Sequence, residues 1–317
     1  MRTFLAPPIA LAGLVVGCLA GCGNAASLGG PDAGAAGPDL TATPTSQRLV
    51  SSDYALTGGQ EVYLCKRFTL TSDLLVRAIT PSSDVGTHHQ VLGVDPNKSA
   101  PDGLGPCGSN LEFDVASWQL LFASGVGSPT LSMPEGVALI LHAGDQLVLQ
   151  MHLLNASPGQ VTGTASLDIA TYPPGTPVTA AEMLLAGPVP DSHLVADVPT
   201  GPGHVVKGLC TMTAPTRLFA VFPHMHQIGR HIQVTTTVAG ASSTLYDADY
   251  QFTEQVFKEF TPIDLAKGDS VHVTCTYDNE TGKPVQFGQS SLQEMCFAIS
   301  YVSPPLPGST FGDFCFF

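Results

Sequence analysis

Alternating apolar and polar positions predict β-strands in two widely separated parts of the chain. Residues 144–155 (GDQLVLQMHLLN) and residues 268–279 (GDSVHVTCTYDN) each place every second side chain on one face, which is the period of a strand. The apolar faces carry Leu147, Leu149, Met151 and Leu153 in the first segment, and Val271, Val273, Cys275 and Tyr277 in the second. Both segments open with Gly-Asp and close with Asn, about 124 positions apart. We therefore expect a duplicated β domain.

The order of other features supports a duplication. A cysteine, a pair of histidines and a Gly-Asp strand follow one another in each half of the chain. The Pro-rich stretch 171–179, TYPPGTPVT, is the expected join, which gives an N-terminal domain over 48–174 and a C-terminal domain over 178–317. The best helix candidate is the short AEMLLAG at 181–187. The pattern predicts an all-β protein of two consecutive antiparallel β-sandwiches.

Composition narrows the class of protein. Glycine and proline number 33 and 26 in a chain of 317 residues, and only 12% of residues are charged, which favours many turns and strands over helices. Twelve basic against 26 acidic residues give a net charge of −14. Nucleic-acid binding needs clustered Lys and Arg, so this class is excluded.

The N-terminus has the form of an export signal. Arg2 precedes an apolar stretch from Phe4 to Gly17, which is too short to span a bilayer. The stretch ends in LAGC at 19–22, which resembles a bacterial lipobox and makes Cys22 the expected lipidation site; VVGC, ending at Cys18, is a weaker match. The alternative is an ordinary secretory signal with incidental cysteines. Either way we expect an exported protein, anchored by lipid at the cell envelope, on the periplasmic face or the cell surface, if Cys22 is modified.

Residues 23–47 consist almost entirely of small and polar residues and proline. A segment of this composition cannot bury enough apolar surface to offset its ordering entropy, so it is predicted to be a flexible tether.

Six cysteines remain after the signal region, and an even number in an exported chain predicts three disulfides. Fifteen pairings are possible from counting alone. There is no CxxC motif, which disfavours a zinc knuckle or a thioredoxin-like site. The six are Cys65, Cys107, Cys210, Cys275, Cys296 and Cys315.

Five histidines lie in contexts that suggest metal ligation. His224 and His226, in PHMHQIG, are two residues apart and so share one face of a strand. His88 and His89 are adjacent, so both reach one metal only if the backbone bulges; otherwise one lies in the core and the other on the surface. His152 alone in a strand is more often satisfied by hydrogen bonds than by a metal.

The remaining residue types point to copper. No carboxylate clusters with these histidines, which disfavours magnesium, calcium and the two-histidine-one-carboxylate iron site. HExxH and GxSxG motifs are absent from the sequence. Met295, in LQEMCFAIS, would normally be core filler, but imidazoles with a thioether favour copper because soft sulfur stabilises its cuprous state.

Several motifs in this order resemble the copper type II, ascorbate-dependent monooxygenases. The resemblance covers nearly all of the sequence expected to fold. It rests on YLC at 63–65, HH at 88–89, QMH at 150–152, HMHQIGR at 224–230 and EMC at 294–296.

The resemblance implies two jelly-roll-like sandwiches with one copper each, on the two sides of an open cleft. His88, His89 and His152 would hold an electron-storing copper, with Gln150 supporting the site from behind its ligands. His224, His226 and Met295 would hold the copper that binds dioxygen and hydroxylates the substrate. The implied disulfides are Cys65–Cys107, Cys275–Cys296 and Cys210–Cys315.

The expected function is therefore hydroxylation of a C–H bond of a small organic molecule by dioxygen, with ascorbate or a similar reductant and two copper ions per chain. Phe222 and Ile299 stand where the peptide-processing members of the family have a substrate-binding arginine and tyrosine, which makes a glycine-extended peptide a doubtful substrate. Together with Phe297 they suggest an apolar wall. The alternative function is a copper-binding or copper-sequestering lipoprotein without turnover.

Overall fold

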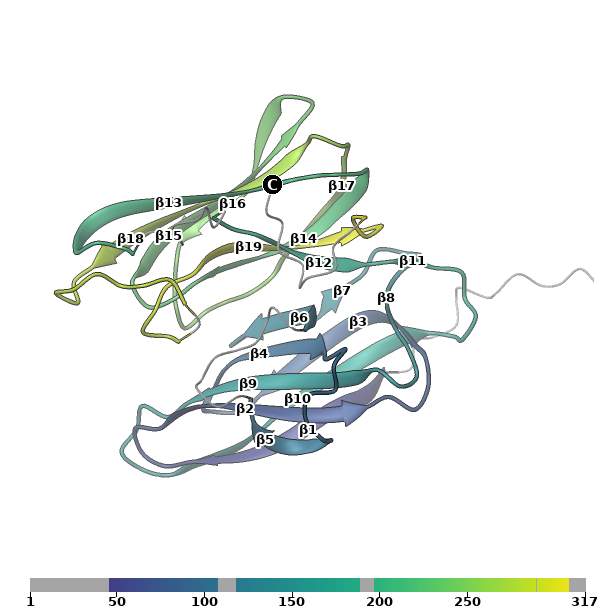
Figure 1. Cartoon of the computed structure of the whole chain (residues 1–317), viewed down its shortest axis with the longest axis horizontal. Helices are drawn as coiled ribbons and strands as arrows, with labels where there is room; N and C mark the ends of the chain where they lie inside the picture. The colour runs from purple at the N-terminus through teal and green to yellow at the C-terminus, as the bar shows by residue number, and fades with distance from the viewer. Residues whose placement is uncertain (1–45, 108–117, 189–196, 289, 308–317) are drawn as a thin grey trace, which may run out of the picture. The chain divides into compact units, whose positions relative to one another are not determined.

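The computed structural model describes residues 46–107, 118–188, 197–288 and 290–307. The predicted lipobox with Cys22, most of the tether, and Cys315 lie outside these residues. In the described segments every regular element is a strand, and no helix is long and apolar enough to cross a membrane. The all-β prediction is confirmed. Figure 1 shows strands β1–β10 in purple to teal and β12–β19 in teal-green to yellow.

The first half of the described chain forms two sheets. One has the order β1 (Ser46–Leu56), β10 (Val161–Tyr172), β3 (Leu74–Ser83), β8 (Val137–Leu141) and β11 (Thr179–Ala180), with β7 (Leu131–Ser132) also pairing with β3. The other has the order β5 (Gly103–Pro106), β2 (Glu61–Thr69), β9 (Gln146–Leu154), β4 (Thr87–Val94) and β6 (Gln119–Gly125). Their apolar faces share one core, to which β1, β3, β9 and β10 all contribute.

The second half also forms two sheets. One has the order β12 (Glu182–Ala186), β19 (Cys296–Ser303), β14 (Thr216–Met225) and β17 (Lys258–Leu265). The other has the order β13 (Gly201–Thr211), β18 (Ser270–Asn279), β15 (Gly229–Val238) and β16 (Ala241–Asp249). These sheets enclose a second core, so each half is a sandwich. All strand pairings named here are antiparallel except that of β11 with β8.

Three strands of the sheet β12-β19-β14-β17 are buried on both faces, namely β12, β19 and β14, whereas β17 is largely exposed. In β14, Leu218 and Val221 belong to the core of the second sandwich, whereas Phe219 and Phe222 belong to the core of the first. One apolar cluster therefore runs from the first sandwich into the second. Burial on both faces explains why β12, β14 and β19 show no alternation in sequence.

The helix candidate at 181–187 is wrong: residues 182–186 form strand β12, with all five residues buried. A short apolar run buried on both faces has no period that separates a strand from a helix.

The two Gly-Asp strands begin in the same way. The N–H of Gly144 donates to the carbonyl of Leu70, and that of Gly268 donates to the carbonyl of Met212. In both turns the carbonyl of the following aspartate accepts a bond in return from the same partner. Both glycines have positive φ, of 91° and 95°, which other L-residues rarely adopt.

The two strands also end in the same way. Asn155 follows β9 and donates to the carbonyl of Gly159, while Asn279 ends β18 and donates to the carbonyl of Lys283. Each side-chain oxygen accepts bonds from the backbone N–H and the hydroxyl two residues further on. Both asparagines are almost fully buried. The repeat seen in the sequence is thus a repeat of hydrogen bonding as well.

Two disulfides join described cysteines, and both are those that the resemblance implied. Cys65 bonds Cys107, and Cys275 bonds Cys296. The second bridge links β18 to the start of β19, directly after Met295. The partner expected for Cys210 is Cys315, outside the described residues.

We predict that Asn155→Ala and Asn279→Ala destabilise the protein equally, by about 2–4 kcal/mol, since each removes several buried hydrogen bonds at about 1 kcal/mol net apiece. Denaturant unfolding measures the change. Asn97→Ala is the matched control: Asn97 is exposed and its substitution should change stability by less than about 0.5 kcal/mol. A large loss at only one of the two buried sites would show that the capping networks are not equivalent.

Candidate metal centre

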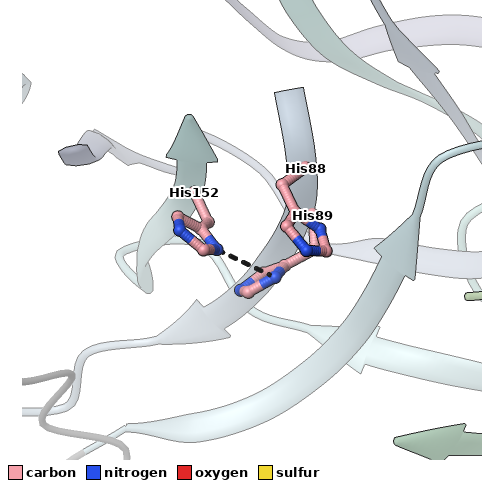
Figure 2. Close-up of side chains that lie close together, drawn as sticks. All are labelled: His88, His89 and His152. Atoms are coloured by element: carbon pink, nitrogen blue, oxygen red, sulfur yellow. Dashed lines mark hydrogen bonds between the residues drawn. The ribbon is translucent and has the colours of Figure 1, made fainter. Parts of the chain in front are cut away.

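Neighbouring strands bring three imidazoles together. His89 of β4 lies directly opposite His152 of β9, so both side chains project from the same face of the sheet. The register of the two strands shifts between Thr87 and His89, which places a bulge at His88. The bulge lets consecutive histidines join one cluster, as Figure 2 shows. The sequence left open whether His88 and His89 lie in one group or on opposite faces of the strand. The bulge in the backbone places them in one group.

The nitrogens of this group have the spacing that a metal requires. Nδ1 of His89 and Nδ1 of His152 are 3.3 Å apart, and one nitrogen from each of the three rings lies within 4.8 Å of the others. Two nitrogens about 2.0–2.1 Å from a common ion are about 3.3 Å apart at a tetrahedral angle. Nε2 of His88 is buried without a hydrogen-bond partner among the described residues. A metal ion would satisfy that atom, so the residues fit an imidazole-bound ion.

The outer nitrogen of His152 is held by a carboxylate. Nε2 of His152 is 2.7 Å from Oε1 of Glu61, and the hydroxyl of Ser291 donates to the same oxygen at 2.7 Å. A carboxylate on the outer nitrogen fixes the ring tautomer and turns Nδ1 toward the cluster. Tyr63 stacks on the ring of His152 with a centroid separation of 4.2 Å.

His224 and His226 lie at the end of β14 and directly after it. Their ring centroids are 5.1 Å apart. Nδ1 of His224 is 2.7 Å from Oε1 of Gln255, and Nδ1 of His226 is 3.0 Å from the carbonyl of Gln293. With both Nδ1 atoms engaged as donors, the Nε2 atoms carry the lone pairs that can bind a metal. This pair therefore offers Nε2, whereas His89 and His152 approach one another through Nδ1.

Glu294 organises the backbone around the second pair. Its carboxylate accepts hydrogen bonds from the N–H groups of His226 and Ile228, at 3.0 and 2.8 Å. The hydroxyl of Tyr277 donates to the carbonyl of Met295 at 2.8 Å. These contacts and the Cys275–Cys296 bridge fix the chain on both sides of Met295.

The two histidine sets face one cavity. His89, His224, His226 and Met295 all line a space of about 80 Å³. The ring centroids of His89 and His224 are 6.2 Å apart. The open cleft that the family resemblance implied is therefore not present: the imidazoles of the two halves nearly touch, because the apolar cluster of the first sandwich continues into the second.

Burial keeps four of the imidazoles neutral. It lowers the pKa of His88 and of His224 to about 4, and the pKa values of His89 and His226 fall well below the usual range for the same reason. Only a neutral imidazole has a free lone pair, so these rings are ready to bind a metal at neutral pH.

Four residues around the site were missed by the sequence reasoning. Glu61 and Glu294 support the two histidine sets, Gln255 orients His224, and the ring of Phe252 meets that of His88 edge-on, with centroids 4.1 Å apart. Strand period gave a weak signal for Glu61, which lies two positions before Tyr63 on the same face. No local pattern marks Phe252 or Gln255, which lie between β16 and β17.

Comparison with known families bears on the second sandwich. Residues 180–307 match the model of the "Copper type II ascorbate-dependent monooxygenase, C-terminal domain". The C-terminal sandwich belongs to that family. The matched range contains His224, His226 and Met295. It begins two residues before β12, the first strand of this sandwich.

Other comparisons add little. None of the curated proteins compared with the chain matches its sequence. Among solved structures, the glycosylasparaginase PNGase F from Flavobacterium meningosepticum is 11% identical and covers 80% of this chain and 96% of its own, with a TM-score of 0.33. The structure of T=1 particles derived from infectious bursal virus is 10% identical and covers 85% of this chain and 71% of its own, with a TM-score of 0.24. At these TM-scores neither likeness carries an argument.

We predict that Glu61→Ala weakens Cu(I) binding at the His88, His89 and His152 group by about 10–100-fold, because His152 loses the carboxylate that orients it. Glu61→Gln should recover part of the affinity through its amide oxygen. Competition with a Cu(I) chelator measures the change. Ser291→Ala, which leaves the Glu61–His152 contact in place, is the control and should have a smaller effect. Equal affinities for all three variants would contradict an orienting role.

Glu294 predicts a pH dependence of stability. Burial raises its pKa to about 7, above the usual value of 4.5 that applies to the unfolded chain. Between these values the folded protein holds a proton that the unfolded chain has lost, so stability falls as pH rises from about 4.5 to about 7, by roughly 3 kcal/mol from this group. Glu294→Gln should remove this part of the slope in denaturant unfolding of the copper-free protein. Parallel pH profiles for the two proteins would contradict the prediction.

Proposed function

We propose that this protein is a copper-dependent monooxygenase that hydroxylates a C–H bond of a small organic molecule. The observation that carries the proposal is the convergence of histidines from both sandwiches and of Met295 on one cavity. The family match of the C-terminal sandwich supports copper and an ascorbate-like reductant. The overall reaction takes R–H, dioxygen, two electrons and two protons to R–OH and water.

Two ion sites are proposed. His88, His89 and His152 would hold the electron-storing copper, and His224, His226 and Met295 the oxygen-activating copper. Copper supplies one-electron redox chemistry and dioxygen binding when it is present. Imidazole ligands alone suit both oxidation states, whereas the thioether of Met295 favours the cuprous one.

The chain's own residues prepare the site for this chemistry. Glu61 and the Gln293 carbonyl hold His152 and His226 in fixed tautomers, so the ligand nitrogens are already aimed before any ion binds. Phe222, Phe297 and Ile299 line the cavity between the two sets and exclude water from it. An electron passing between the sets would stay within a water-poor space, which limits the escape of reactive oxygen.

The protein is further proposed to act outside the cytoplasm, anchored through a lipid on Cys22. The disulfides Cys65–Cys107 and Cys275–Cys296 fit an oxidising compartment. The domains proposed for this exported chain are 48–174 and 178–317, preceded by the signal segment 1–22 and the tether 23–47.

The first test is copper stoichiometry with oxygen uptake. We expect two copper ions per chain by elemental analysis, and oxygen consumption that depends on ascorbate and on a substrate chosen from a panel of small molecules. Two tightly bound ions without substrate-linked oxygen consumption would favour the alternative, a copper-storage protein. The cavity shared by two unlike ligand sets favours the enzyme, since storage gives no reason to join them.

Met295→Leu separates the two proposed sites. It removes the thioether but keeps the apolar volume, so the fold and the copper bound by His88, His89 and His152 should persist while hydroxylation is lost. Met212→Leu, in the core of the second sandwich, is the matched control and should keep activity. Turnover at the wild-type rate in Met295→Leu would remove Met295 from the reaction.

His152→Ala tests the other set. Copper per chain should fall from two to one, and electron supply to the reaction should stop. His142→Ala, which removes an exposed histidine, should leave both ions bound. An unchanged stoichiometry in His152→Ala would exclude His152 as a ligand.

A further inference from the structure

The cavity between the two histidine sets has walls that define what can enter it. Strands β6, β12, β14 and β19 contribute its apolar side, and Tyr63, Gln150 and the histidines its polar side. Most apolar wall residues are almost fully buried, whereas Val91 of β4 and Met295 are partly buried. The apolar residues include Leu120, Met183, Leu185, Phe222, Phe297 and Ile299.

No residue that lines the cavity has an acidic or a basic side chain of the Asp, Glu, Lys or Arg type. The two carboxylates that support the histidine sets are already committed: Glu61 to His152 and Ser291, and Glu294 to two backbone N–H groups. An ammonium or carboxylate entering this space would lose its hydration and gain no opposite charge from the protein. That loss is large unless the charge is paired.

Two residues that line the cavity have a buried polar atom without a hydrogen-bond partner among the described residues: Gln90 through Oε1 and Gln150 through Nε2. Gln90 lies opposite Met151, whose side chain is in the core, so Gln150 is the one on the histidine face. Gln150 lies two positions before His152 on β9 and therefore on the same face of the sheet, opposite Val91 of β4. Only 2% of its surface is exposed, and its Nε2 has no hydrogen-bond partner among the described residues. A buried amide donor without a partner is unfavourable by about 1–3 kcal/mol, which a ligand carrying an acceptor would recover.

The volume sets the scale of the occupant. At about 80 Å³ the cavity is smaller than the roughly 150 Å³ apolar cavity that admits benzene in another protein. The space suits a chain of a few carbons, or the reacting end of a slightly larger molecule.

We infer that the cavity binds a small uncharged molecule with an apolar body and one hydrogen-bond acceptor, such as a short alcohol or ketone, with the acceptor directed to Gln150. That this molecule is the substrate rests on the proposed function. The reaction then inserts one oxygen atom into a C–H bond of the apolar body, and the second atom of dioxygen leaves as water after taking up two electrons from the reductant and two protons.

A matched set of four-carbon probes tests this inference. Butan-1-ol, butan-2-one, butyrate and butylammonium have similar size and differ in charge. Ligand-observed NMR on the full chain, copper-free and loaded with diamagnetic Cu(I), measures binding of each at neutral pH. Cu(I) is a soft ion with little preference for carboxylates, so both forms report on the cavity. We expect the two neutral probes to bind at least about tenfold more tightly than the two charged ones.

Gln150→Leu tests the acceptor. The variant removes the amide but keeps much of the volume, so it should weaken butan-2-one binding by about fivefold to tenfold. Gln146→Leu is the control: Gln146 lies on the same strand but bonds Ala100 and Asp102, away from the cavity, so ketone binding should persist. Thermal unfolding of both variants verifies that they are folded. Undiminished binding of butan-2-one to Gln150→Leu, or an equal loss in both variants, would remove Gln150 from recognition.

Two failures are distinguishable. Binding of butyrate or butylammonium as tight as that of the neutral probes, or no binding of either neutral probe, overturns the inference about the cavity. Neutral-selective binding in a protein that never couples oxygen consumption to any substrate leaves this inference standing and overturns the proposed monooxygenase. Oxygen consumption driven only by charged substrates overturns the inference about the cavity and leaves the proposed monooxygenase standing.

Discussion

The packing of the sheet β12-β19-β14-β17 against the first sandwich is the contact on which the candidate site depends. Phe222, Phe297 and Ile299 extend from the second sandwich into the apolar cluster of the first. His224 follows Phe222 by two residues on β14, so the strand that carries this packing also carries a histidine to the cavity. Without that apolar contact the two histidine sets would each remain a half-exposed group on a separate sandwich.

The same burial has an energetic consequence for the histidines. Five imidazoles close together in an apolar space would repel one another if protonated. Burial lowers the pKa values of four of them, so these persist as neutral rings: His88, His89, His224 and His226. Neutral buried imidazoles need partners for their nitrogens. Glu61, Gln255 and the Gln293 carbonyl satisfy one nitrogen on each of three rings. The nitrogens left over face inward, which is the arrangement a metal ion completes.

The two-residue period of strands in the sequence was enough to predict much of the fold and part of the candidate site. The alternation in 144–155 correctly separated Leu149 and Met151, in the core, from Gln150 and His152, on the site face. It failed for 182–186, which is buried on both sides and has no alternation. It could not decide whether His88 and His89 act together, because a bulge is a property of the pairing between β4 and β9 and not of either sequence alone. Phe252 and Gln255 reach the histidines only through tertiary contacts, so no local pattern could reveal them.

Each histidine set is supported by the other half of the molecule. Ser291, from the second sandwich, donates to the Glu61 carboxylate that holds His152 of the first. In the opposite direction, Gly125 of β6 donates its N–H to the carbonyl of Gln255, whose side chain holds His224. A Cβ at Gly125 would lie 2.6 Å from the Cβ of Gln255, so only glycine permits this approach. If the halves separate, Glu61 loses the hydroxyl of Ser291 and Gln255 loses the N–H of Gly125. The residues that orient the two sets therefore lose their support together, and the two groups form a single unit. A change that loosens the contact between the sandwiches should therefore disturb both histidine sets together, even when every ligand is still present.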